Sequence, residues 1–149
     1  MNVMSRYPFR NSLLVPVTLL LAGFATAAPA STRTVPPDRL GSYWIWTSSA
    51  SEVHVPNHGQ NLYKPGCASA SYTIGSDGVP RNIKLEKVVP SSDLGPAVVE
   101  AVRNFRYRPG ADNPGQQPVR TWYTAQFNMR NLPQEQKDKL TAACDLTGY

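Results

Sequence analysis

The fold of this chain is decided by residues 67–129, and mainly by three pieces of them: SYTIGSDGVP (71–80), AVRNFRYRPG (101–110) and VRTWYTAQFN (119–128). Apolar and small polar residues alternate across 67–74, which predicts a strand with one buried face. Asp77-Gly78 predicts a tight turn, because both residues tolerate a positive φ. The second strand of a hairpin is expected to follow this turn and to be closed by Pro90, with Ile83 and Leu85 on one face and Asn82, Lys84 and Glu86 on the other.

A helix and a third strand follow. Ser91-Ser92-Asp93 offers helix caps, and Pro96 fits the first turn. Apolar residues then recur at helical spacing and give the helix one apolar face; they are Ala97, Val98, Ala101, Val102 and Phe105. The third strand has two alternating faces. One face carries Val119, Thr121, Tyr123, Ala125, Phe127 and Met129, and the other carries Arg120, Trp122, Thr124, Gln126 and Asn128.

These elements predict an α+β fold with two layers, in which one main helix packs on a three-stranded antiparallel sheet in the order β-β-α-β. A C-terminal helix is expected from Pro133, with Asn131 as its cap. The 149 residues suffice for one domain with extensions. We expect a leader at 1–27, an N-terminal extension at 28–61 that is partly flexible, a core domain at 62–130 and a helical extension at 131–149.

The leader has the pattern of a signal peptide. Arg6 and Arg10 precede an apolar stretch, and Ala25-Thr26-Ala27 offers a cleavage site. The apolar stretch is shorter than the roughly 20 residues that span a bilayer. We therefore expect cleavage after Ala27 and export; the alternative is an uncleaved membrane anchor.

The two cysteines are predicted to form a disulfide. Cys67 begins the first core strand and Cys144 lies near the end of the C-terminal helix. In an oxidising compartment, two cysteines in a small domain are candidates for pairing. The alternative is two unpaired thiols, one of them buried. The wide separation of these cysteines does not match the spacing of metal ligands.

The N-terminal extension contains one aromatic cluster. Residues 28–42 are rich in Pro, Thr, Ser and Ala and predict a flexible entry segment, and residues 47–66 predict a loop. Between them, Tyr43-Trp44-Ile45-Trp46 is interpreted as hydrophobic packing, which the large ring area favours. The alternative interpretation is an aromatic platform for a glycan or another ligand.

Charge and motifs argue against several functions. The formal charge of +5 falls to +3 without Arg6 and Arg10, and no basic run is present, which argues against a nucleic-acid partner. His54 and His58 have the spacing of a helical metal pair, but the Pro and Gly around them disfavour a helix. The sequence has no nucleophile elbow and no phosphate loop. We therefore expect no catalytic residue, no metal site, no cofactor and no small-molecule substrate.

The order of strand, Asp-Gly turn, strand, helix, basic-aromatic corner and strand resembles the C-terminal domain of TonB, the periplasmic module that grips outer-membrane transporters. The resemblance covers about residues 62–130, slightly over half of the chain that follows the leader. Its most specific piece is the end of the helix. The matching residues are Val102, Arg103, Phe105, Arg106, Tyr107 and Pro109, with support from Asp77 and Gly78.

This resemblance implies a periplasmic protein that binds an extended segment of a TonB-dependent outer-membrane transporter by β-strand addition. An edge strand exposes unpaired N–H and C=O groups, so an extended peptide can continue the ladder. The implied pairing residues are Arg120, Thr121, Trp122, Tyr123, Thr124, Ala125, Gln126, Phe127 and Asn128. Trp122 is interpreted either as a partner contact or as cover for the second sheet face. Arg103, Arg106 and Arg108 either meet acidic groups of a partner or form a solvated face.

Three features depart from a full TonB. The apolar leader has no histidine, a long spacer rich in Pro-Glu and Pro-Lys is missing, and residues 63–67 match the family's Tyr-Pro-x-x-Ala entry only distantly. Peptide binding is compatible with these departures, whereas force transmission from the inner membrane is not expected. Two functions therefore remain open: a transport accessory, or a cell-envelope structural or interaction module. The second predicts an edge covered by residues 43–66, or a partner that docks elsewhere. A homodimer formed by swapped edge strands is compatible with both.

Overall fold

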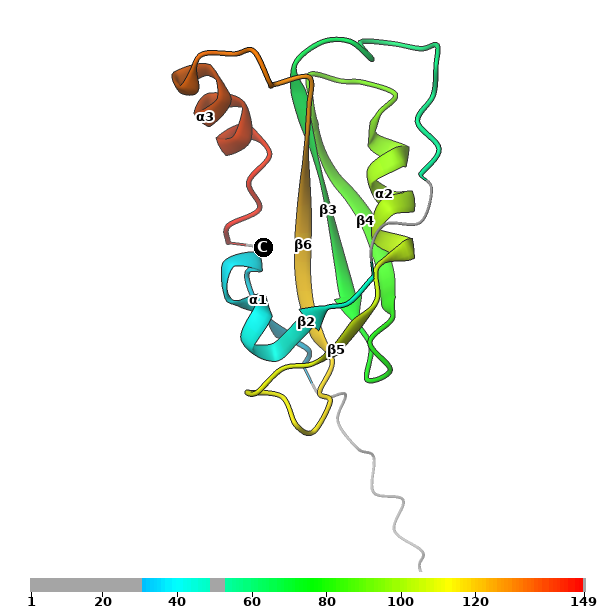
Figure 1. The fold of residues 1–149 in the computed structure, drawn as a ribbon, viewed down its shortest axis with the longest axis vertical. Helices are drawn as coiled ribbons and strands as arrows, with labels where there is room; N and C mark the ends of the chain where they lie inside the picture. The colour runs from blue at the N-terminus through cyan, green and yellow to red at the C-terminus, as the bar shows by residue number, and fades with distance from the viewer. Residues whose placement is uncertain (1–30, 49–52, 149) are drawn as a thin grey trace, which may run out of the picture. The chain divides into compact units, whose positions relative to one another are not determined.

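The computed structural model describes residues 31–48 and 53–148. Its main sheet has four strands in the order β1-β6-β3-β4 (Figure 1). The strands β3 (Gly66–Ile74), β4 (Pro80–Val89) and β6 (Val119–Phe127) form the predicted antiparallel sheet, with β3 in the middle. The fourth strand, β1 (Arg33–Thr34), was not predicted, and it pairs with β6 in parallel. The α+β class is confirmed.

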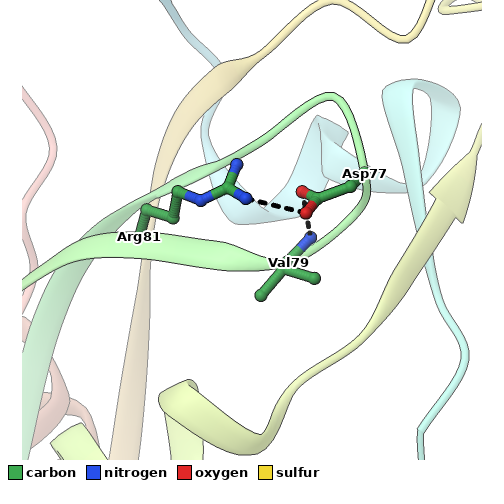
Figure 2. A network of polar contacts seen from close by, with 3 residues as sticks. All are labelled: Asp77, Val79 and Arg81. Atoms are coloured by element: carbon green, nitrogen blue, oxygen red, sulfur yellow. Dashed lines mark hydrogen bonds and ion pairs between the residues drawn. The ribbon is translucent and has the colours of Figure 1, made fainter.

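The turn between β3 and β4 is the predicted Asp-Gly turn. Gly78 has a φ of 74°, and a side chain there would overlap the backbone of Tyr107. Figure 2 shows how the Asp77 carboxylate holds the turn. It accepts a hydrogen bond from the N–H of Val79 at 3.2 Å, and it forms an ion pair with the guanidinium of Arg81 at 2.7 Å. These contacts lower the pKa of Asp77, with the Val79 N–H as the largest cause.

The helix α2 (Gly95–Asn104) covers one face of the sheet. The main core between them is made of buried side chains from α2, β3, β6 and the N-terminal segment. Its members are Val35, Trp44, Ala68, Ala70, Tyr72, Ile74, Val98, Val102, Phe105 and Val119. The helix ends at Asn104, so Phe105 reaches this core from the residue after the helix. The expected caps at 91–93 do not cap α2, because its N-cap is Leu94, with no side-chain bond, and Asp93 instead binds the N–H of Gln60.

The helix α3 (Gln134–Ala143) lies on the other side of the sheet from α2 (Figure 1). The predicted disulfide is present and joins Cys67 of β3 to Cys144, the residue after α3. The hydroxyl of Ser69 also donates to the carbonyl of Cys144 at 2.5 Å. As a result both faces of β3 are buried, where the sequence predicted one. The N-cap of α3 is Pro133 and not Asn131.

The end of β6 corrects another prediction. Met129 was expected on the same face as Tyr123 and Phe127, but it packs with Cys67 and Cys144 on the α3 side. The cause is Asn128, whose φ of 54° breaks the alternation of the strand. The Asn128 side chain donates to the carbonyls of Leu62 and Lys64 and so fixes this bend.

The N-terminal segment is more ordered than its composition predicts. After β1 comes a short helix, α1 (Pro37–Tyr43), and then β2 (Trp44–Trp46), which pairs antiparallel with β5 (Tyr107–Pro109). Val35 and Trp44 are almost fully buried, and this burial anchors the segment. The proposed signal peptide lies outside the described residues. Among 31–48 and 53–148, no helix has the length and apolarity to cross a membrane.

Candidate functional site

The outer edge of β6 has no paired strand over most of its length. β3 occupies one side of β6 from Val119 to Phe127, whereas β1 occupies the other side only at Val119 and Arg120. The Arg120 carbonyl points outward, because it accepts the N–H of Val35 at 2.8 Å. Backbone groups of alternate strand residues point the same way. The N–H and C=O groups of Trp122, Thr124 and Gln126 therefore also point outward, and no backbone group within the described ranges pairs with them.

A cluster of aromatic rings lies beside this edge. Phe105 is at its centre, with ring centroids 5.1 Å from both Trp46 and Tyr123 and 6.4 Å from both Tyr72 and Tyr107. Phe105 and Tyr72 are buried, but Trp46 is 55% exposed and Tyr123 is 36% exposed. The cluster therefore presents apolar ring surface to solvent beside the open strand.

An open cleft of about 240 Å³ lies between the aromatic cluster and α1; we call it the aromatic cleft. Trp122 and Tyr123 both line it, although neighbouring residues of a strand point to opposite faces. The cleft therefore lies at the edge of β6, where the two faces meet. Its other lining residues are Pro37, Leu40, Gly41, Trp44, Trp46, Tyr72, Phe105 and Tyr107.

Most polar groups of the aromatic cleft already have partners. The hydroxyls of Tyr72 and Tyr107 share a hydrogen bond of 2.6 Å. The Trp44 Nε1–H donates to the carbonyl of Gln117 at 3.1 Å, and the Trp46 Nε1–H donates to Ser48 at 3.3 Å. Burial raises the pKa of Tyr107 to about 12, and it raises the pKa of Tyr72 as well, so both hydroxyls stay protonated at neutral pH.

Arginines occur on the segments near the aromatic cleft, but none of them lines it. The segments that line it carry more arginines than acidic residues, and the described ranges contain no ion pair that involves any of these charges. Arg33 stacks over the ring of Tyr43 at 4.8 Å, and Arg108 is exposed on β5. The charged residues of these segments are Arg33, Arg39, Arg103, Arg106, Arg108 and Arg120 against Asp38, Glu100 and Asp112. Arg120 lines a separate pocket beside β1, and Arg103 lines one beside α2 together with Glu100.

The structure brings most of the predicted site residues together. Residues 120–127 lie in β6, and Asn128 follows the strand. Thr121 is fully buried and Trp122 is 9% exposed, so Trp122 mainly covers the sheet, and it also lines the cleft. The motif residues Phe105 and Tyr107 belong to the aromatic cluster.

The contribution of the N-terminal segment to the site was not predicted. The aromatic run at 43–46 was a signal, but only its packing was favoured. Trp44 is indeed buried, whereas Trp46 is exposed at the cleft. The pairing of β2 with β5 could not be derived, because strands of three residues carry too little periodicity.

Comparisons with known proteins gave a family and a similar solved structure. The model of the family "Gram-negative bacterial TonB protein C-terminal" matches residues 56–129. Among solved structures, the chain is similar to the solution NMR structure of the Pseudomonas aeruginosa TonB C-terminal domain, with 17% identity and a TM-score of 0.47. That match covers 68% of this chain and 100% of the other. No curated protein matched. The resemblance seen in the sequence is thereby confirmed, and this chain belongs, through residues 56–129, to the family of Gram-negative bacterial TonB C-terminal domains.

Proposed function

We propose that this chain is a periplasmic binding module that takes an extended segment of a partner protein as an added strand on the outer edge of β6. This proposal rests on the outward N–H and C=O groups of Trp122, Thr124 and Gln126, because they can form backbone hydrogen bonds with an added strand. Membership of the TonB C-terminal family supports an outer-membrane TonB-dependent transporter as the first partner to test. The role is binding without catalysis.

Strand addition suits this edge for a physical reason. The backbone of the partner supplies affinity through ladder hydrogen bonds, and its alternate side chains meet the two faces of β6. β6 is held rigidly by β3 along its whole length, so little ordering of the module is needed on binding. β1 ends the available edge at Arg120.

The experiment is an NMR titration of the protein, purified from cells that express the full chain, with extended peptides from TonB-dependent transporters. We expect amide shifts concentrated in residues 120–128. The Gln126→Pro variant removes an outward N–H without touching the β3 ladder, and should weaken binding several-fold. Gln126→Ala is the matched control, because it also loses the side-chain bond to Thr141 but keeps the N–H. Equal binding by both variants would contradict strand addition.

A second candidate is a cell-envelope interaction module that keeps the fold without energy transduction. The pairing of β1 with Val119 and Arg120 favours it, because it shortens the edge that a partner can use. It is β1, and not residues 43–66, that pairs with this edge in the described ranges. No shifts with any transporter peptide, from a well-folded protein, would favour this candidate. A concentration-dependent dimer that Gln126→Pro abolishes would assign the edge to a second copy of the chain.

A further inference from the structure

We propose that the aromatic cleft receives one large apolar side chain of the added strand, and that the arginines on neighbouring segments favour acidic residues in the same peptide. The module would then select partners by sequence as well as by extended shape. This inference rests on the proposed strand addition and deepens it.

The chemistry of the aromatic cleft fits an apolar occupant. The hydroxyls of Tyr72 and Tyr107 bond to each other, and the indole N–H groups of Trp44 and Trp46 are taken by Gln117 and Ser48. A glycan would leave many of its hydroxyls without partners against such walls. A Phe or Leu side chain needs only the ring surface that Trp46 and Tyr123 expose.

The position of the aromatic cleft fits a side chain that comes from an added strand. The cleft lies at the edge of β6 beside Trp122, the first residue past β1 whose outward backbone groups are open. A strand paired there points alternate side chains to either face. One of its side chains therefore lies over the cleft while its backbone binds the ladder.

One wall of the aromatic cleft lies outside the family domain. Pro37, Leu40 and Gly41 of α1 and Trp46 of β2 precede residues 56–129, which the family model matches. β2 holds this wall in place by pairing with β5, and Val35 anchors it in the core. The selectivity that the cleft confers would therefore be a property of this chain's own N-terminal segment.

Charge complementarity defines the rest of the occupant. Arg39 and Arg108 are exposed and adjoin the lining residues Leu40 and Tyr107, and neither has an ion pair within the described ranges. Alternation along β5 turns the Arg108 side chain to the face opposite Tyr107, so its charge acts on a peptide from a distance. Asp38 and Asp112 are fewer than the arginines around them. A peptide with Glu or Asp beside its apolar residue is attracted to this surface, whereas a basic peptide is repelled.

The test uses a variant that fills the cleft. Gly41 lines the cleft, and a Cβ added there meets no atom within 4 Å, so Gly41→Leu adds an apolar side chain at this wall with open space around its first carbon. Gly115→Leu is the matched control, since it adds the same side chain in the 110–118 loop, where only the Gln117 amide lies near. The probes are two synthetic extended peptides that differ only in a central Phe or Ala and carry flanking Glu residues.

The unaltered chain and Gly115→Leu should bind the Phe peptide about tenfold more tightly than the Ala peptide, from the burial of one ring. Gly41→Leu should bind both peptides equally and about as tightly as the unaltered chain binds the Ala peptide. Trp46→Ala should reduce the preference for Phe, and Tyr63→Ala, which removes an exposed ring elsewhere, should not.

Three outcomes would overturn the inference. If both peptides bind at the β6 edge with equal affinity, the cleft does not select, while strand addition stands. If neither peptide shifts the β6 amides, the proposed function fails and the inference falls with it. If the Phe preference survives in Gly41→Leu, the ring is bound elsewhere.

Discussion

At the scale of single residues, Thr121 has an unusual environment. Its side chain is fully buried between β3 and the core, and its hydroxyl has no hydrogen-bond partner within the described ranges. A buried hydroxyl without a partner destabilises the folded state. We predict that Thr121→Val, which replaces the hydroxyl by a methyl group of similar size, raises the free energy of unfolding by about 1 kcal/mol. Urea denaturation measures this change, and a lower midpoint would refute it.

The tyrosine pair makes the fold sensitive to alkali. The folded state raises the pKa of Tyr107 to about 12 and that of Tyr72 in the same direction, mainly by burial. In the unfolded chain both titrate near pH 10. The unfolded state therefore loses protons first as the pH rises. The stability that these tyrosines contribute is present below about pH 10 and is lost as the pH climbs through the folded pKa values.

We therefore predict that the free energy of unfolding falls steeply above about pH 10. Urea denaturation at a series of pH values gives the slope, and the tyrosinate absorbance band follows the ionisation. In Tyr107→Phe one of the two groups is gone, so the slope should be shallower. The same slope in the variant and the unaltered chain would show that other groups cause the alkaline loss.

At the scale of elements, the disulfide attaches α3 to the sheet. α3 has no buried residue of its own, so packing alone holds it weakly. Replacing both Cys67 and Cys144 by Ala should cost about 4 kcal/mol in the chain-entropy model for a separation of this length. We also predict that the amides of residues 134–146 lose hydrogen-exchange protection, while those of β6 keep most of theirs. Unchanged protection in α3 would contradict this account.

The length of each element decided whether it could be predicted from the sequence. β3, β4, α2 and β6 were predictable, because each is long enough for its periodicity to be read. The bend after β6 was not, since it depends on Asn128 adopting a positive φ and binding the carbonyls of Leu62 and Lys64. β1 was not predicted, because two residues are too few to show a periodicity and they form a strand only by pairing with β6. The open edge could be proposed from the family resemblance, but the aromatic cleft depends on contacts between segments far apart in the chain.

At the scale of the whole molecule, the site lies where two parts of the sequence meet. The family domain contributes the strand edge and the rings of Phe105 and Tyr107, and the N-terminal segment contributes α1 and Trp46. Arg39, Arg106, Arg108 and Arg120 lie on these same segments. Local charge, rather than the modest net charge of the chain, should therefore attract an acidic partner.

This leads to a prediction about association rates. Between about 0.1 M and about 1 M salt, the Debye length shrinks from about 10 Å to about 3 Å, so exposed arginines no longer attract a distant peptide. We expect the association rate constant of the acidic Phe peptide to fall several-fold over this range, with little change in its dissociation rate constant. Arg108→Glu should lower the association rate at low salt. Lys139→Glu changes the net charge equally but lies on α3, which does not line the cleft, so it should have a much smaller effect. Stopped-flow fluorescence gives both rate constants, and equal effects of the two variants would mean that net charge, and not the arginines around the cleft, guides the encounter.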